Sequence, residues 1–168
     1  WDVAVSYADH LGKSPEDTAV DMANPGLAIW PNPAQVAQPV GDWSQHASSW
    51  MEAKIPRLTV RYEDMVNNSL ETFRQIGRFA SFDEDEDRLK RAIRFSSFEE
   101  LSSQEDADGF AERSQHASKF FREGGVGGWR EVLPQSVVRK IGKDHRKMAL
   151  RLGYMTTDRR ILVGNTAA

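Results

Sequence analysis

The chain has 168 residues, 39% of them hydrophobic and 28% charged, which is typical of a soluble globular domain with a sizeable core. Its formal net charge of −3 argues against a general nucleic-acid binder, so no nucleic acid is expected among its partners. The absence of cysteine excludes disulfides and thiolate metal sites, and no apolar run approaches the roughly 18 residues of a membrane-spanning helix, so no membrane partner is expected.

The first residues predict an amphipathic helix. Asp2 is the predicted N-cap, and Val3, Val5 and Leu11 give the helix an apolar side. The chain begins with Trp1 rather than methionine, and it carries no signal-peptide pattern. We therefore expect residues 1–168 to form a single domain that is incomplete at its N-terminus.

Residues 12–42 are predicted to form an ordered loop or lid within that domain. The stretch NPGLAIWPNPAQVAQPVG holds four of the seven prolines and few charges, and proline disfavours helix interiors and central strands. Residues 43–54 return to helical spacing. The short run RLTVRY, residues 57–62, alternates and is rich in β-branched side chains, which favours a strand, although so short a run does not decide the assignment alone.

The second half of the chain predicts mainly helices. Asn68 and Glu71 have the spacing of a capping box at the start of one helix, and the acids of residues 83–87 begin another. A short helical turn follows Ser96, and a last helix is expected from near Pro134 to near Gly153. A single strand cannot pair with itself, so either the fold is all-α or the partner strands lie outside this chain. We favour the second alternative.

The segment FFREGGVGGWR, residues 120–130, contains four of the twelve glycines within five positions. Glycine permits positive φ angles and close backbone approach, so that successive amides can point into one concavity. Arg122 adds a bidentate fork suited to phosphate or sulfate. The alternative is a flexible connection before a helix, and composition alone does not choose between an anion site and a connection.

Three further patterns have two interpretations each. Ser6, in the first turn of the opening helix, could donate to a phosphate oxygen or be an ordinary surface serine. Tyr62 ends the predicted strand, where open α/β sheets bind ligands, or else closes the rim of the core. Ser96 and Ser97 before Phe98 suit phosphate contact and base stacking, but equally a helix cap followed by a core phenylalanine. The four histidines lack metal-ligand spacing, so no metal is expected.

The order of these motifs resembles that of the cytosolic-type sulfotransferase family. DVAVSY is followed by two tryptophans, then by RYEDM, SSFEEL and FFREGGVGGW, from Trp1 to about Tyr154. The resemblance implies an α/β, P-loop-like three-layer fold with a parallel sheet, represented here mainly by its helix-rich C-terminal part, in a cytoplasmic enzyme. It implies transfer of a sulfuryl group from 3′-phosphoadenosine 5′-phosphosulfate (PAPS) to a hydroxyl or amine of a small-molecule acceptor, which leaves adenosine 3′,5′-bisphosphate (PAP).

The resemblance also implies which residues bind the nucleotide. Ser6, Arg122 and the Gly124 backbone correspond to the groups that hold the 3′-phosphate. Tyr62 corresponds to the tyrosine that reaches the adenine, and Phe98 to the phenylalanine that stacks on it. The complete set of expected nucleotide-binding residues is Ser6, Tyr62, Ser96, Ser97, Phe98, Arg122, Glu123 and Gly124.

The sequence departs from the family pattern in ways that limit the expected role. The family's 5′-phosphosulfate loop and catalytic histidine lie N-terminal to the motifs present here, so no catalytic residue is assigned and this chain is expected to supply the 3′-phosphate and adenine side. Glu123 stands where the family has lysine, and Pro134 and Gln135 replace its Thr-Val dimer motif, which leaves the oligomeric state open. His10 is a candidate substitute base. The alternatives are a non-catalytic nucleotide-binding module and a helical protein-interaction module that uses the basic last helix.

Overall fold

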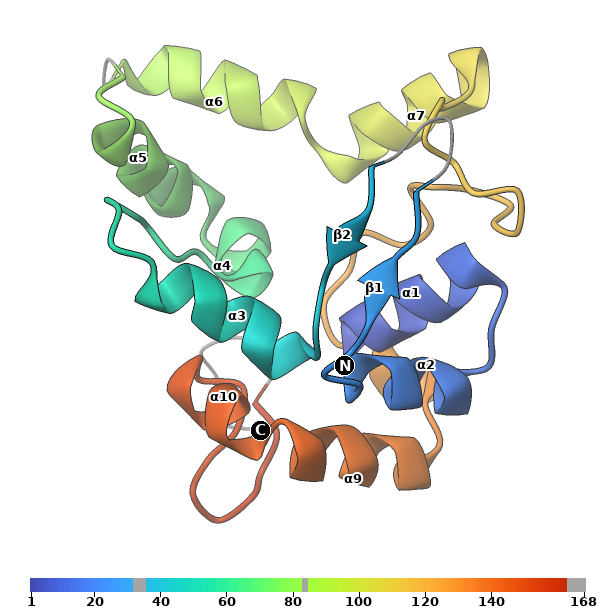
Figure 1. Ribbon diagram of the computed structural model, residues 1–168. Coiled ribbons are helices and arrows are strands. Elements are labelled where there is room, and N and C mark those ends of the chain that lie inside the picture. Colours follow the sequence, from blue (N-terminus) through green and yellow to red (C-terminus); the bar gives the residue numbers. More distant parts are fainter. Residues whose placement is uncertain (32–35, 83–84, 163–168) are drawn as a thin grey trace. The chain divides into compact units, whose positions relative to one another are not determined.

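The computed structural model describes residues 1–31, 36–82 and 85–162. In this part of the chain, the fold is helix-rich, with one short antiparallel hairpin of two strands (Figure 1). The elements in chain order are α1 (Asp2–Leu11), α2 (Pro15–Met22), β1 (Ala28–Ile29), β2 (Gln38–Pro39), α3 (Trp43–Glu52), α4 (Tyr62–Asn67), α5 (Ser69–Phe79), α6 (Glu86–Phe95), α7 (Phe98–Asp108), α8 (Trp129–Val132), α9 (Gln135–Asp144) and α10 (Arg146–Arg151).

The described residues divide into two compact units. Unit 1 comprises Trp1–Ile55 and Gly127–Leu162, and unit 2 comprises Pro56–Val126. Each unit is described by itself below. No described helix is both long enough and apolar enough to cross a membrane.

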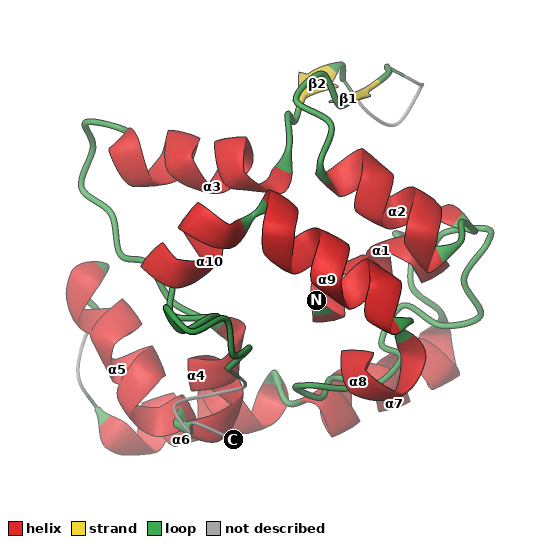
Figure 2. Ribbon diagram, turned by 90° about the horizontal axis from the view of Figure 1, so that it is seen from below, coloured by secondary structure: helices red, strands yellow, loops and turns green. Residues whose placement is uncertain are grey.

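Unit 1 has an apolar core built around α9. This helix contacts α2 and α10, α10 in turn contacts α3, and Figure 2 shows these helices side by side. Val137, Val138 and Ile141 of α9 are buried, as are Ala4 and Val5 of α1. The strong apolar stripe of α9 therefore explains why the last quarter of the chain and the first helix form one unit.

The two ends of unit 1 are joined by specific contacts at α9. The indole Nε1 of Trp1 donates to the carbonyl oxygen of Val138 at 3.1 Å. A Cβ at Gly142 would lie 3.0 Å from the methyl carbon of Met155 and 3.5 Å from the Trp1 ring, so this glycine permits close packing. Trp1, from the beginning of the chain, and Met155, from near its end, thus both pack against α9.

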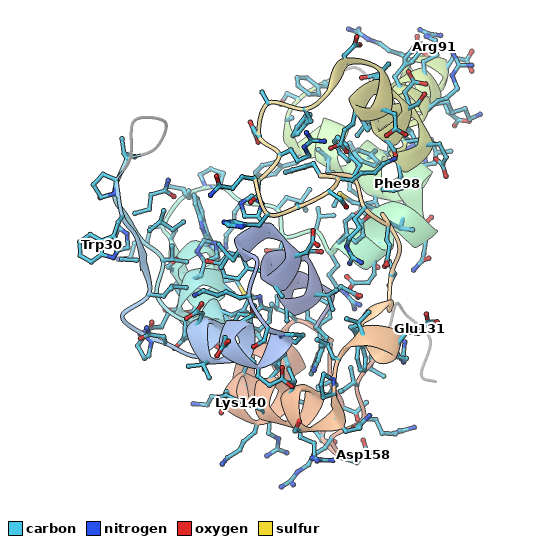
Figure 3. The ribbon with its side chains drawn as sticks, turned by 90° about the vertical axis from the view of Figure 1, so that its right-hand side faces the viewer. Trp30, Arg91, Phe98, Glu131, Lys140 and Asp158 are labelled. Carbon is cyan, nitrogen blue, oxygen red and sulfur yellow. The ribbon has the colours of Figure 1, made fainter. Side chains whose placement is uncertain are left out.

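Residues 12–42 were expected to be a loop, and this prediction is wrong for α2. The Ser14 hydroxyl accepts the Asp17 amide at 3.1 Å, and Pro15 occupies the first turn, where a missing N–H costs nothing. The hairpin follows, with Ala28 opposite Pro39. Trp30 is 81% exposed and projects outward beside the hairpin (Figure 3). Residues 32–35 of the predicted lid lie outside the described part of the chain.

Unit 2 contains α4 to α7, and its first segment differs from the prediction. Residues 57–61 form no strand within the described chain, and Tyr62 begins α4 instead of ending a strand. The Arg61 backbone is extended, but extended backbone becomes a strand only when a neighbouring strand satisfies its amides and carbonyls. The predicted strand thus has an extended backbone at Arg61, but it pairs with no other strand within the described residues.

The helix caps also differ in part from the prediction. Asn68 makes no side-chain cap bond to the described residues, whereas Asp42 and Gln45 of unit 1 form a complete capping box at α3. The predicted last helix is broken at His145 into α9 and α10. The His145 ring is buried, and its Nδ1 lies 2.9 Å from the Ser44 hydroxyl. This side-chain anchoring accompanies the break in the helix.

The two units differ in what they bury. Every buried hydrophobic side chain among the described residues belongs to unit 1. In the described part of unit 2, the buried side chains are those of Thr72 and Glu105, both polar. Local order in unit 2 thus depends on hydrogen bonds as well as on partly exposed apolar contacts.

Candidate functional site

Gly124 is the residue at which several predicted site residues of unit 2 meet. Its φ angle is +60°, a region that residues with a Cβ rarely adopt. The Tyr62 hydroxyl, at the start of α4, donates to the Gly124 carbonyl oxygen at 2.7 Å. A Cβ on Gly124 would lie 2.9 Å from the Cβ of Phe98 and closer still to its ring atoms Cγ and Cδ2. The structure therefore brings Tyr62, Phe98 and Gly124 together (Figure 3 shows Phe98 at the beginning of α7).

The backbone that follows Arg122 offers unused donors. Among the hydrogen bonds of the described residues, none uses the amides of Glu123, Gly124, Gly125 or Val126. Backbone amides of this kind, beside a residue with positive φ, form concavities that bind anions. The segment thus has the donor set that a phosphate or sulfate group requires.

Arg122 and Glu123 form an ion pair next to these amides. The Arg122 Nη1 lies 2.8 Å from Oε1 of Glu123, and both side chains are partly exposed. An exposed pair of this kind is worth about 1 kcal/mol or less. Glu123 is therefore a weak internal counter-ion of Arg122, which an incoming dianion with stronger hydrogen-bonding capacity can replace.

A buried carboxylate that the sequence analysis missed fixes the backbone before Arg122. Oε1 of Glu105 accepts the Phe120 amide at 2.7 Å, and Oε2 accepts the Phe121 amide at 2.9 Å. The bond from the Phe120 amide is the main cause that lowers the pKa of Glu105 below its ordinary value, despite the opposing effect of burial. Glu105 is therefore ionised at neutral pH. No local sequence pattern could have identified it, because its partners lie 15 and 16 residues further along the chain.

The glycine-rich segment continues into unit 1, where a second carboxylate fixes it. Asp2 was predicted to cap α1, but the N-cap is Trp1. The Asp2 carboxylate instead accepts the Gly127 amide at 2.9 Å and the Trp129 amide at 3.0 Å. The amides just before Arg122 and just after Val126 are thus bound by carboxylates, whereas the amides of residues 123–126 donate to no acceptor within the described chain.

The remaining predicted site residues have other contacts. The Ser97 hydroxyl accepts the Glu100 amide at 3.3 Å and caps α7, as the alternative interpretation held. The Ser96 hydroxyl donates to the Ala92 carbonyl oxygen at 2.9 Å. Ser6 and His10 are exposed on α1, in unit 1. Within the described residues, no group of three or more side chains is arranged to bind a metal ion.

Comparison with known proteins adds two findings. Residues 1–152 match the sulfotransferase domain family. Among solved structures, the chain is similar to mouse sulfotransferase SULT7A1, which was crystallised in complex with PAP, with 24% sequence identity and a TM-score of 0.53. The similarity covers 81% of this chain but 56% of the mouse protein chain. At this identity, the structural likeness supports the fold.

Proposed function

The chain belongs to the sulfotransferase family, and from this premise we propose that it takes part in PAPS-dependent sulfuryl transfer. The proposed reaction moves a sulfuryl group from PAPS to a hydroxyl or amine of a small-molecule acceptor and releases PAP. The contribution proposed for this chain is the binding of the 3′-phosphate and the adenine of the nucleotide. PAPS, when bound, supplies the activated sulfuryl group, and we assign no catalytic base to this chain.

The observation that carries the proposal is the donor set that begins at Arg122. The guanidinium precedes the amides of residues 123–126, which donate to no acceptor among the described residues, and Gly124 has the positive φ that allows the backbone to curve. A phosphate dianion needs several oriented donors, and charge-assisted hydrogen bonds are about twice as strong as neutral ones. We therefore propose that Arg122 and the amide of Gly124 bind the 3′-phosphate. Ser6 is proposed as a further phosphate ligand on the family resemblance alone.

Two aromatic residues support the adenine part of the proposal. Phe98 offers a flat apolar surface, and stacking of a base on such a ring is worth about 1–3 kcal/mol. Tyr62 donates its hydroxyl hydrogen to Gly124, so we propose that it holds the glycine-rich segment while its ring borders the adenine. Ser96 and Ser97 are proposed to act indirectly, because their hydroxyls bond to backbone atoms around the beginning of α7.

The finer fold assignment is also a proposal. We propose a P-loop-like three-layer arrangement with a parallel sheet. The support is the fold likeness to the mouse sulfotransferase, since the two strands of the described residues pair antiparallel.

A transfer assay tests the proposed function. The intact protein is incubated with labelled PAPS and a panel of phenols, alcohols and amines, and labelled product is measured. The Arg122→Ala variant should raise the KM for PAPS by about tenfold or more, because one charged hydrogen-bonding group is lost. Arg91→Ala, which removes an exposed arginine of the same unit, should leave the KM unchanged. Binding of PAP without transfer to any acceptor would instead favour a non-catalytic module.

A further inference from the structure

The carboxylate of Glu105 fixes two consecutive peptide groups at once. In an extended chain, neighbouring amides point in opposite directions, so both reach one carboxylate only when the backbone is turned. Here the Phe120 and Phe121 amides converge on Glu105 at 2.7 and 2.9 Å. The next amide, that of Arg122, donates to the Phe120 carbonyl oxygen at 3.1 Å. The backbone is therefore constrained up to Arg122, and the amides without an acceptor in the described part of the chain begin at Glu123.

Among the described residues of unit 2, few other buried side chains could fix the Phe120–Phe121 backbone. The Glu105 side chain is 5% exposed, and in the described part of unit 2 Thr72 is the other buried residue. The rings of Phe110, Phe120 and Phe121 pack together with centroids 4.5 to 5.2 Å apart, but Phe120 is itself 41% exposed. Aromatic packing alone leaves the peptide planes free to rotate, whereas two hydrogen bonds to one carboxylate do not.

We propose that Glu105 is a positioning residue of the nucleotide site: it holds the Phe120–Phe121 backbone so that Arg122 and the amides after it face the 3′-phosphate. The inference rests on the proposed function, because it assigns a role in the same site. Glu105 does not contact the phosphate in this account. Its negative charge is bound by the two amides, so it shapes an anion site without occupying it.

The test compares two nucleotides that differ only in the 3′-phosphate, PAP and adenosine 5′-monophosphate. Glu105→Gln retains one carbonyl acceptor but turns an NH₂ group toward the other amide, which leaves that amide unsatisfied. Calorimetry on the intact protein should show PAP binding weakened by about tenfold, since hydrogen bonds to charged groups are lost, while adenosine 5′-monophosphate binding is unchanged. Asp106→Asn is the matched control, because this neighbouring acid is exposed and pairs with Lys119, and its PAP affinity should stay within about twofold of wild type.

A double-mutant cycle separates positioning from general destabilisation. If Glu105 acts through Arg122, then Glu105→Gln should cause little further loss of PAP affinity in the Arg122→Ala background. Glu105→Asp keeps the negative charge but has a side chain one methylene shorter, so it should also weaken the binding of PAP and not that of adenosine 5′-monophosphate. This variant replaces Glu105→Gln in the test if the glutamine variant does not fold. Unchanged PAP affinity, equal weakening of both nucleotides, or additive losses in the cycle would overturn the inference.

The same data distinguish this inference from the proposed function. If wild-type protein binds PAP no better than adenosine 5′-monophosphate, or if Arg122→Ala has no effect, the assignment of the 3′-phosphate site fails. If Arg122→Ala weakens PAP but Glu105→Gln does not, the site stands and the positioning role of Glu105 falls.

Discussion

Replacement of Gly124 by alanine tests whether the glycine-rich segment needs the conformation seen here. Gly124 has a φ of +60°, which costs a residue with a Cβ roughly 1–2 kcal/mol. The new Cβ would also lie 2.9 Å or less from atoms of Phe98, and overpacking of this kind costs about 1–3 kcal/mol. The sum is a local cost of about 2–5 kcal/mol, which the segment can avoid only by moving away from Phe98 and from the Tyr62 hydroxyl.

Calorimetry with PAP and thermal unfolding of the intact protein measure this cost. We expect Gly124→Ala to weaken PAP binding by about tenfold or more, because the segment would leave the conformation that is proposed to present its amides to the phosphate. Gly125→Ala is the control: its Cβ would lie 3.9 Å from the Glu123 carbonyl oxygen, which is ordinary contact, so affinity should change by less than about 0.5 kcal/mol. If Gly124→Ala binds PAP as tightly as Gly125→Ala does, the reasoning about this segment is refuted.

Three other outcomes follow from the structure. Glu123→Gln should strengthen PAP binding by about twofold to fivefold in calorimetry, because Arg122 loses its exposed counter-ion, and unchanged or weaker binding would contradict that role. Burial lowers the pKa of His145 below its ordinary value of about 6.5, so the unfolded chain binds a proton that the native state does not, and the free energy of unfolding should fall as the pH drops below about 6.5. In urea titrations, this fall in the free energy of unfolding at low pH should be smaller in His145→Gln than in wild type, and unchanged in the exposed His46→Gln. Equal falls in both variants would argue against His145 as the group responsible. Hydrogen exchange should be faster in α5 and α6 than in α9, whose apolar side is buried, and equal protection would contradict the difference in burial.

The family and most helices could be predicted from the sequence because their signals are local or ordered along the chain. The match of residues 1–152 to the sulfotransferase domain confirms the resemblance that rested on motif order. Amphipathic spacing predicted α1, the Asn68–Glu71 spacing marked the beginning of α5, Pro134 that of α9, and the acids before α6 that of α6. Ser97 was recognised as a residue that either caps a helix or binds a ligand, and its bond to the Glu100 amide supports the cap.

The sequence could not show contacts that depend on tertiary structure. Residues 57–61 have strand-like composition, but composition does not supply a neighbouring strand. Residues 12–42 were predicted to be a loop from the prolines after Asn24, but α2 begins earlier, at Pro15, where proline in the first turn is favourable. Asp2 and Glu105 each bind backbone amides that are distant in sequence, and neither carries a local pattern that distinguishes it from a solvated acid.

The most direct test of the central claim is the affinity of the intact protein for PAP, measured by calorimetry in wild type and in Arg122→Ala. The account predicts saturable PAP binding that Arg122→Ala weakens by about 1.5–3 kcal/mol, the value of a hydrogen bond to a charged group. Arg91→Ala should bind PAP as wild type does. Equal PAP affinity in Arg122→Ala and wild type would contradict the claim that the segment beginning at Arg122 binds the 3′-phosphate.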